Sequence, residues 1–277
     1  LLLLVGYGTK MGLAPMHTWL PEAHSEAPSP VSALLSGALL PCAFLAILRV
    51  TQVGAAAGDM PFLSRPLVGM GLFSMLVAAI FLVRQADFKR MLAYSSVEHM
   101  GILALALGLG SAARFGLLLH VWVHGLTKAA LFLAAGNLAH AYGSKNANQV
   151  RGAWRRLPVS GPLFLIGIFA ISGSPPFGPF VSEWAILAGA CDAGRYGVAA
   201  LMLLLLLGVF LGMGATALKV VQGRPSWEAR QSAHRDTWMN ASPIVVLLLL
   251  ALGAGIALPP PATALLHEAA RLLEGVP

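Results

Sequence analysis

Three ionisable side chains follow one another at four-residue intervals inside an apolar stretch of the chain: His120, His124 and Lys128. On a helix this spacing places them on one face over about 12 Å. Histidine titrates near neutral pH, and a lysine removed from water can exchange protons as well. We therefore predict that the row carries protons, although an interhelical hydrogen bond explains His120 equally well.

Four more ionisable residues fall within apolar stretches: Lys10, Glu98, His99 and Glu183. Lys10 is about 15 Å of helix from the expected end of its segment at residues 20 and 21, hence near mid-membrane, and a structural ion pair is its alternative role. Neighbouring Glu98 and His99 point about 100° apart and should face different neighbours. Glu183 opens a helix after a proline-rich run, which favours a gate or exit site, with a helix cap as the alternative.

The elements that hold these residues are predicted from composition. Hydrophobic residues make up 57% of the 277 residues and charged residues 10%, against about 25% charged in soluble domains. The mean hydropathy is +0.77. This strongly apolar composition with few charges excludes soluble enzymes and nucleic-acid binders. It predicts an all-α, polytopic transmembrane helix bundle. Eight spanning segments are expected at about 1–20, 30–50, 66–85, 92–109, 115–140, 161–191, 196–218 and 241–258.

Two of these segments contain helix breakers and are predicted to be discontinuous. The first contains Pro15, where an ordinary proline kink is an equal alternative. The other contains residues 173–179, with Pro175, Pro176 and Pro179. Non-helical backbone at membrane depth is tolerated where it is buried or lines a wet cavity, so both breaks indicate a polar path.

The basic residues divide unevenly between the two ends of the predicted spans. Five lie at one end: Arg49, Arg65, Arg114, Arg195 and Arg271. Eleven lie at the other: Arg84, Lys89, Arg90, Lys145, Arg151, Arg155, Arg156, Lys219, Arg224, Arg230 and Arg235. The positive-inside rule puts the richer end in the cytoplasm and the C-terminus outside. The net charge of +7 then reflects topology and contact with anionic lipid.

The same reasoning divides the chain into a transmembrane bundle over residues 1–258 and a short amphipathic tail over 259–277 on the outer surface. Residues 21–28 are expected to form a charged loop at the cytoplasmic mouth, which either feeds protons inward or is a solvated turn. The chain begins with four leucines, as a fragment starting inside a helix would.

Cysteine usage gives no support for redox chemistry. Cys42 and Cys191 lie far apart, without a CxxC pair or a local His/Cys cluster. We therefore expect no metal site, no cofactor and no catalytic residue in this chain.

Four stretches form long, specific motifs: residues 10–37, which include the run KMGLAPMHTWLPEAHSEAPSP, and residues 87–96, 124–132 and 180–183. They resemble the antiporter-like membrane subunits of respiratory complex I and their hydrogenase relatives. Residues 25–30 and 97–101 are most similar to the hydrogenase-4 component F group of that family.

The resemblance implies a fold of two inverted helical repeats, of which this chain would hold the second. It matches Lys10 to the lysine of a broken helix, Lys128 to a central lysine and Glu183 to the terminal charged group of the path. The glutamate that pairs with Lys10 in the family would precede Leu1. Pro41 departs from the pattern, because many complex I members have a lysine there.

The function that the resemblance implies is that of a non-catalytic, proton-translocating subunit of an energy-converting hydrogenase in a prokaryotic plasma membrane. Its expected partners are the membrane and hydrophilic subunits of such an assembly and the lipid bilayer, with no nucleic acid. Two alternatives remain: a complex I or multisubunit cation/proton antiporter subunit, and a structural scaffold that does not conduct.

Overall fold

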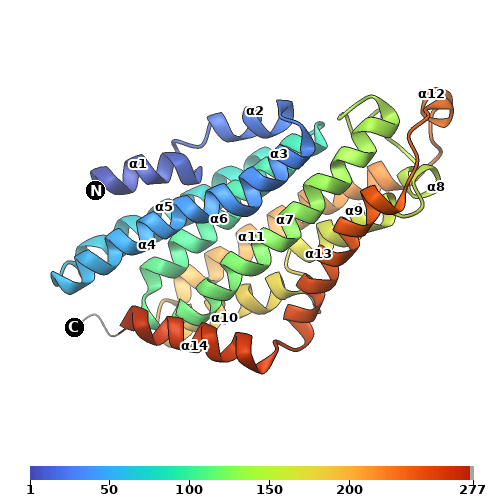
Figure 1. The fold of residues 1–277 in the computed structure, drawn as a ribbon. Helices are drawn as coiled ribbons and strands as arrows, with labels where there is room; N and C mark the ends of the chain where they lie inside the picture. Colours follow the sequence, from blue (N-terminus) through green and yellow to red (C-terminus); the bar gives the residue numbers. More distant parts are fainter. Residues whose placement is uncertain (275–277) are drawn as a thin grey trace.

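The computed structural model describes residues 1–274, which fold into helices joined by short connections (Figure 1). The helices are α1 Leu2–Met11, α2 Trp19–Glu26, α3 Ser29–Leu34, α4 Leu40–Ala56, α5 Met60–Leu82, α6 Phe88–Leu109, α7 Arg114–Tyr142, α8 Ala153–Arg156, α9 Ser160–Ile171, α10 Gly178–Asp192, α11 Tyr196–Val221, α12 Trp227–Gln231, α13 Trp238–Ile256 and α14 Pro260–Glu274. A π-helical turn, Leu35–Leu39, joins α3 to α4, and a 3₁₀ turn, Ser111–Ala113, precedes α7.

Six of the described helical segments are long and apolar enough to cross a membrane: Ser29–Ala56, Met60–Leu82, Phe88–Leu109, Ser111–Tyr142, Tyr196–Val221 and Trp238–Ile256. The other two predicted segments are each divided into a pair of shorter helices, α1 with α2 and α9 with α10. The predicted all-helical membrane bundle with two discontinuous helices is confirmed.

The backbone groups that the first break frees find partners within the protein. Helix α1 ends at Gly12, whose φ of 82° is left-handed. Beyond it, the Ala14 amide donates to Ser74 Oγ at 2.9 Å, and Trp19 Nε1 donates to the Thr9 carbonyl at 2.7 Å. Helical structure resumes only at Trp19, so the segment is interrupted rather than kinked at Pro15.

The second break is a turn between α9 and α10. The Ser174 amide donates to the Phe169 carbonyl at 3.1 Å, and the Phe177 amide donates to the Ser174 carbonyl at 3.2 Å. These local bonds turn the backbone without a continuous helix, as the three prolines require.

The expected loop over residues 21–28 is mostly helical, and that prediction was wrong. Pro21 falls in the first turn of α2, where a proline sacrifices no helical hydrogen bond. Glu22 pairs with Arg90, and Glu26 Oε1 lies 2.8 Å from Lys145 Nζ. Because that hydrogen bond favours the carboxylate, it lowers the pKa of Glu26. Helical structure after the first break therefore continues to Glu26.

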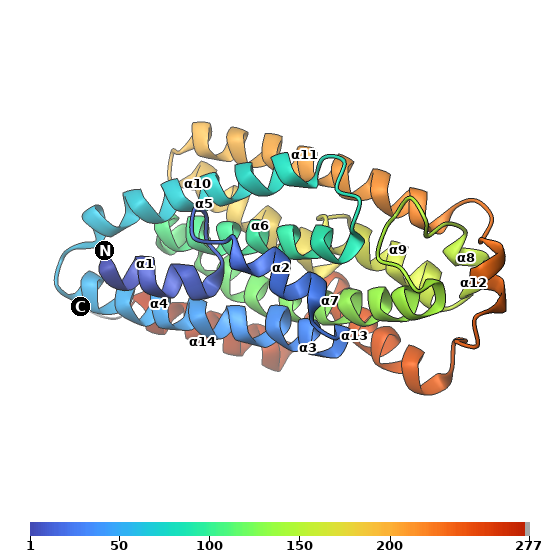
Figure 2. The ribbon, with the colours of Figure 1, turned by 90° about the horizontal axis from the view of Figure 1, so that it is seen from above.

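Helix α6 lies inside the bundle and contacts both α5 and α7 (Figure 2). Asp87 caps its N-terminus, accepting from the amides of Lys89 at 2.8 Å and Arg90 at 3.0 Å. Gly71 of α5 and Gly101 of α6 allow the two backbones to approach closely, since a Cβ at Gly101 would lie 2.7 Å from the Gly71 carbonyl oxygen. This packing fixes the position of Glu98 and His99 one turn away.

The predicted tail is the amphipathic helix α14, and its residues 275–277 lie outside the described part of the chain. Its Leu266 packs against the bundle, while Leu265 and Leu272 are exposed. His267 stacks on Phe115 of α7 with ring centroids 4.8 Å apart. Helix α14 thus lies across the end of the bundle opposite α8 and α12 (Figure 1).

Candidate functional site

The row on α7 is buried inside the bundle. His120, His124 and Lys128 have no exposed surface, and the ring centroids of the two histidines lie 6.2 Å apart. Lys128 Nζ donates to the Leu92 carbonyl of α6 at 2.8 Å. The predicted stacking of three ionisable groups on one helical face is therefore present.

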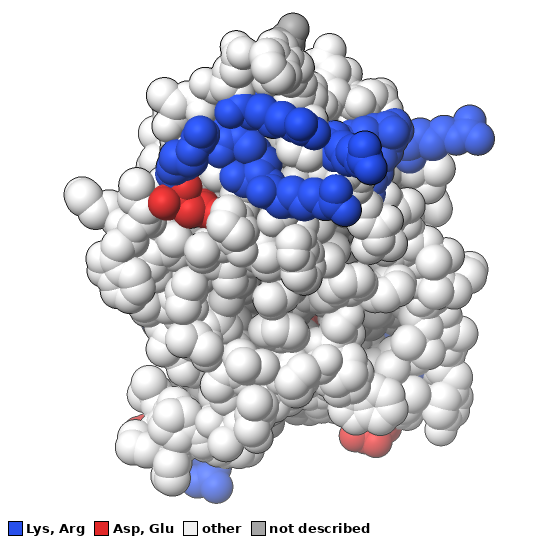
Figure 3. All heavy atoms as spheres, turned by 90° about the vertical axis from the view of Figure 1, so that its right-hand side faces the viewer, with Lys and Arg blue, Asp and Glu red and all other residues white. Residues whose placement is uncertain are grey.

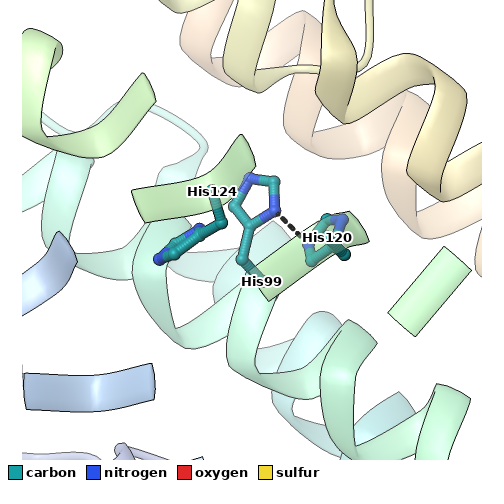
Figure 4. Close-up of side chains that lie close together, drawn as sticks. All are labelled: His99, His120 and His124. Atoms are coloured by element: carbon teal, nitrogen blue, oxygen red, sulfur yellow. Dashed lines mark hydrogen bonds between the residues drawn. The ribbon is translucent and has the colours of Figure 1, made fainter. Parts of the chain in front are cut away.

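His99 of α6 inserts between the two histidines of α7 (Figure 4). Its ring centroid lies 5.0 Å from that of His120 and 5.0 Å from that of His124. His99 Nδ1 and His120 Nε2 are hydrogen-bonded at 3.0 Å. Histidines from two helices thus form one cluster, which the sequence spacing within α7 cannot reveal.

Ser182 of α10 extends this hydrogen-bond chain. Its hydroxyl donates to the Pro179 carbonyl at 2.8 Å and lies 2.9 Å from His120 Nδ1. Because its hydrogen is used in the first bond, Ser182 accepts from His120 Nδ1–H, which leaves His120 Nε2 to accept from His99 Nδ1–H when both rings are neutral. The bonds run in one direction, from His99 to Ser182.

Glu183 lies beside this chain and against the second helix break. Its Oε1 is 3.9 Å from His99 Nδ1 and has no hydrogen-bond partner among the described residues. Gly173 has a left-handed φ of 70°, and a Cβ there would collide with Glu183 Oε2. The break therefore provides the space that the carboxylate occupies.

Glu98 completes a strip of ionisable groups. It is 2% exposed, and its Oε2 has no hydrogen-bond partner within the described part of the chain. Its charge acts on Lys128 of α7 and on Glu183 of α10. We call Glu98, His99, His120, His124, Lys128 and Glu183 the buried strip.

Lys10 is not part of the buried strip. It lies in the last turn of α1, as predicted, but its side chain is exposed. Pro41 also lies away from the strip, because it lines an apolar groove with Val121 and Trp122 on the outside of α7. The structure therefore places six of the seven predicted path residues together.

Two residues near the strip were not predicted as site residues. Ser182 belongs to the predicted motif at 180–183, but only the fold places it beside His120. His24 of α2 is fully buried, stacks on Phe132 with centroids 4.8 Å apart, and has neither ring nitrogen hydrogen-bonded in the described structure. The four-residue interval between Leu20 and His24, both buried, was the available signal.

The histidine cluster could in principle hold a cation, since one nitrogen from each of His99, His120 and His124 lies within 4.8 Å of the others. A zinc ion needs such nitrogens at about 2.0–2.1 Å, with their lone pairs directed at one point. His99 Nδ1 and His120 Nε2 instead point at each other in a hydrogen bond of 3.0 Å. This arrangement suits proton transfer better than metal binding.

Comparison with known proteins agrees with this architecture. The profile of the NADH:quinone oxidoreductase/Mrp antiporter transmembrane family matches residues 1–212. The chain is 40% identical over 263 residues to a hydrogenase-4 component F homolog of Methylacidiphilum infernorum, covering 93% of this chain and 53% of that protein. It is 32% identical over 279 residues to hydrogenase-4 component B of Escherichia coli, covering 93% and 42%.

A solved structure extends the likeness to three dimensions. A chain of respiratory complex I from Thermus thermophilus with bound NADH superposes with a TM-score of 0.86 at 25% identity, over 99% of this chain and 57% of that chain. The chain spans about half the length of the curated relatives it matches. By profile, sequence and fold, it belongs to the NADH:quinone oxidoreductase/Mrp antiporter transmembrane family.

Proposed function

We propose that this chain translocates protons as part of a membrane subunit of an energy-converting hydrogenase of the hydrogenase-4 type. The observation that carries the proposal is the buried strip, in which six ionisable side chains from three helices lie together beside a broken helix. A charge inside a membrane is costly, and ionisable groups retained there commonly mark an ion or proton pathway.

The strip supports a stepwise transfer of protons. A proton that binds His99 Nε2 would release the hydrogen on Nδ1 to His120 Nε2, which moves the positive charge to His120 while its Nδ1–H stays bonded to the Ser182 hydroxyl. Glu98 interacts electrostatically with Lys128 of α7 and with Glu183 of α10, so it links the two ends of the strip. A change of charge at Lys128 can therefore affect Glu183, and the reverse.

Lys10 is proposed as a separate member of the path at the first break. Its exposed charge would be stabilised at membrane depth by a carboxylate of another segment of the assembly. Partner subunits would supply the redox chemistry, while this chain moves charge. The proposed location is a prokaryotic plasma membrane, with the richer basic end in the cytoplasm and α14 at the outer surface.

A complex I or Mrp-type antiporter subunit is the second candidate, favoured by the close superposition on a complex I chain. The 40% identity to a hydrogenase-4 component F homolog favours the first. Both candidates use the buried strip in the same way.

The test is proton uptake by proteoliposomes that contain the whole complex. Lys128→Met keeps the side-chain volume and removes the titrating group, and Lys128→Arg keeps the charge but cannot be deprotonated. Both variants should lower uptake by about tenfold or more while hydrogenase activity and subunit content are retained. Lys219→Met removes an exposed lysine that bonds to Asn148 and should leave uptake unchanged.

Normal uptake by both Lys128 variants would refute the relay. Uptake that survives in Lys128→Arg and is lost in Lys128→Met would show a fixed structural charge, which is the scaffold role.

A further inference from the structure

Four arginines line a pocket of about 400 Å³ at the end of the molecule that holds α8 and α12. They are Arg155, Arg156, Arg230 and Arg235, and Pro225 completes the lining. Figure 3 shows Lys and Arg gathered over this end. We call these four residues the arginine pocket. It lies at the opposite end of α7 from His120 and is not used in the proposed proton path.

The arginine pocket is held in shape by backbone carbonyls rather than by acids. Arg156 is buried; its Nε donates to Ala229 O at 2.6 Å, and its Nη2 donates to Ser232 O at 2.8 Å and His234 O at 2.7 Å. Arg235 Nη1 donates to the same carbonyls of Ser232 and His234. Carbonyls satisfy the donors but bring no full negative charge.

No ion pair among the described side chains neutralises the positive charge of the pocket. Asp236 acts on Arg156 only from a distance, since its carboxylate accepts from the amides of Val159 and Ser160 and from the Ser160 hydroxyl. None of the four arginines forms a salt bridge with a carboxylate whose side chain the structure describes. The arginine pocket is therefore ready to receive an anion.

Three exposed tryptophans place the pocket at the edge of the bilayer. Trp154, Trp227 and Trp238 are 55%, 72% and 83% exposed. They lie on α8, on α12 and at the start of the apolar helix α13. Tryptophan concentrates where membrane meets water, at the level of the lipid headgroups.

From this position and charge we infer that the arginine pocket binds the phosphodiester headgroup of an anionic phospholipid. Guanidinium groups match phosphate oxygens in paired hydrogen bonds, which makes arginine suited to such a headgroup. Basic pockets beside membrane helices bind anionic headgroups for the same reason. A lipid in this position would tie the connection between α11 and α13 to the membrane surface.

The test removes two arginines whose side chains make no hydrogen bond to the described residues. Arg155→Gln/Arg230→Gln lowers the pocket charge and leaves the bonds of Arg156 and Arg235 intact. Arg49→Gln/Arg65→Gln, at exposed positions outside the pocket, removes the same charge and is the matched control. The purified complexes are delipidated and titrated with phosphatidylglycerol, cardiolipin or phosphatidylcholine, and bound lipid is counted by native mass spectrometry.

The expected result is about thirtyfold weaker retention of phosphatidylglycerol and cardiolipin by the pocket variant. Retention by the control variant and binding of phosphatidylcholine should not change. Equal retention by the parent and the pocket variant would overturn the inference, as would an equal loss in the control. Displacement of the lipid by inorganic phosphate would mark a free-anion site instead. Loss of a partner subunit with unchanged lipid retention would mark a docking site for an acidic protein segment.

Discussion

An imidazole passes a proton along a chain only while one nitrogen accepts and the other donates. His120 meets this condition, because its Nε2 faces His99 and its Nδ1 faces Ser182. The serine hydroxyl, fixed by its own bond to the Pro179 carbonyl, decides which nitrogen of His120 carries the hydrogen. Ser182, which carries no charge, therefore sets the direction of this hydrogen-bond chain.

Ser182→Ala is expected to slow proton uptake about fivefold, which corresponds to about 1 kcal/mol for one hydrogen bond. Thr127→Val is the matched control, because the buried Thr127 hydroxyl donates only to the Val123 carbonyl of its own helix. The measurement is proton uptake by proteoliposomes that contain each variant at equal subunit content. Equal rates in both variants would show that Ser182 does not orient His120.

Gly173→Ala is expected to displace the Glu183 carboxylate, because the added Cβ would occupy its position. Gly194→Ala is the control: that glycine has a similar positive φ of 69°, but its Cβ would meet open space. Uptake should fall by about tenfold to a hundredfold in the first variant only, the scale of a misplaced reacting group. If the two variants behave alike, backbone strain rather than Glu183 accounts for the loss.

At the residue scale, the row on α7 was predictable because its spacing lies within one helix. The insertion of His99 was not, since it depends on the register in which α6 packs against α7. The same holds for Ser182, which approaches His120 across a contact between α10 and α7.

Among the elements, α5 and α6 pack closely over two opposed glycines, Gly71 and Gly101. A Cβ at Gly101 would lie 2.7 Å from the Gly71 carbonyl oxygen and 3.0 Å from Ser74 Cβ. Gly101→Ala should therefore destabilise the protein by about 1 to 3 kcal/mol through overpacking and lower the midpoint of thermal unfolding in detergent.

The control on the partner helix is Gly69→Ala, whose Cβ would have nothing within 4 Å. It should leave the unfolding midpoint unchanged or raise it, because alanine favours the helix by about 1 kcal/mol. A midpoint in Gly101→Ala that matches the parent would mean that α5 and α6 can separate at little cost.

The two helix breaks were predictable, because prolines and glycines cluster there in the sequence. Helix α2 was not. Its proline and charges resemble those of a loop, but the ion pairs of Glu22 with Arg90 and of Glu26 with Lys145 fix it against distant parts of the chain. Only tertiary contacts supply these partners.

For the whole molecule, sidedness is testable by cysteine labelling. Asn148 and Ala193 are exposed in connections at opposite ends of the spans. In a background with Cys42 and Cys191 replaced by alanine, an impermeant thiol reagent added outside the cell should label Ala193→Cys and not Asn148→Cys. The reverse pattern would show that the basic end faces outward.

Helix α6 has a consequence for how the protein is made. Although apolar enough to span a membrane, it is almost entirely surrounded by protein and contains Lys89, Glu98 and His99, which are costly to expose to lipid. A nascent segment of this kind is poorly retained by the bilayer on its own. We expect α6 to leave the insertion machinery only after α7 has been synthesised, so that α5, α6 and α7 enter the membrane as one unit.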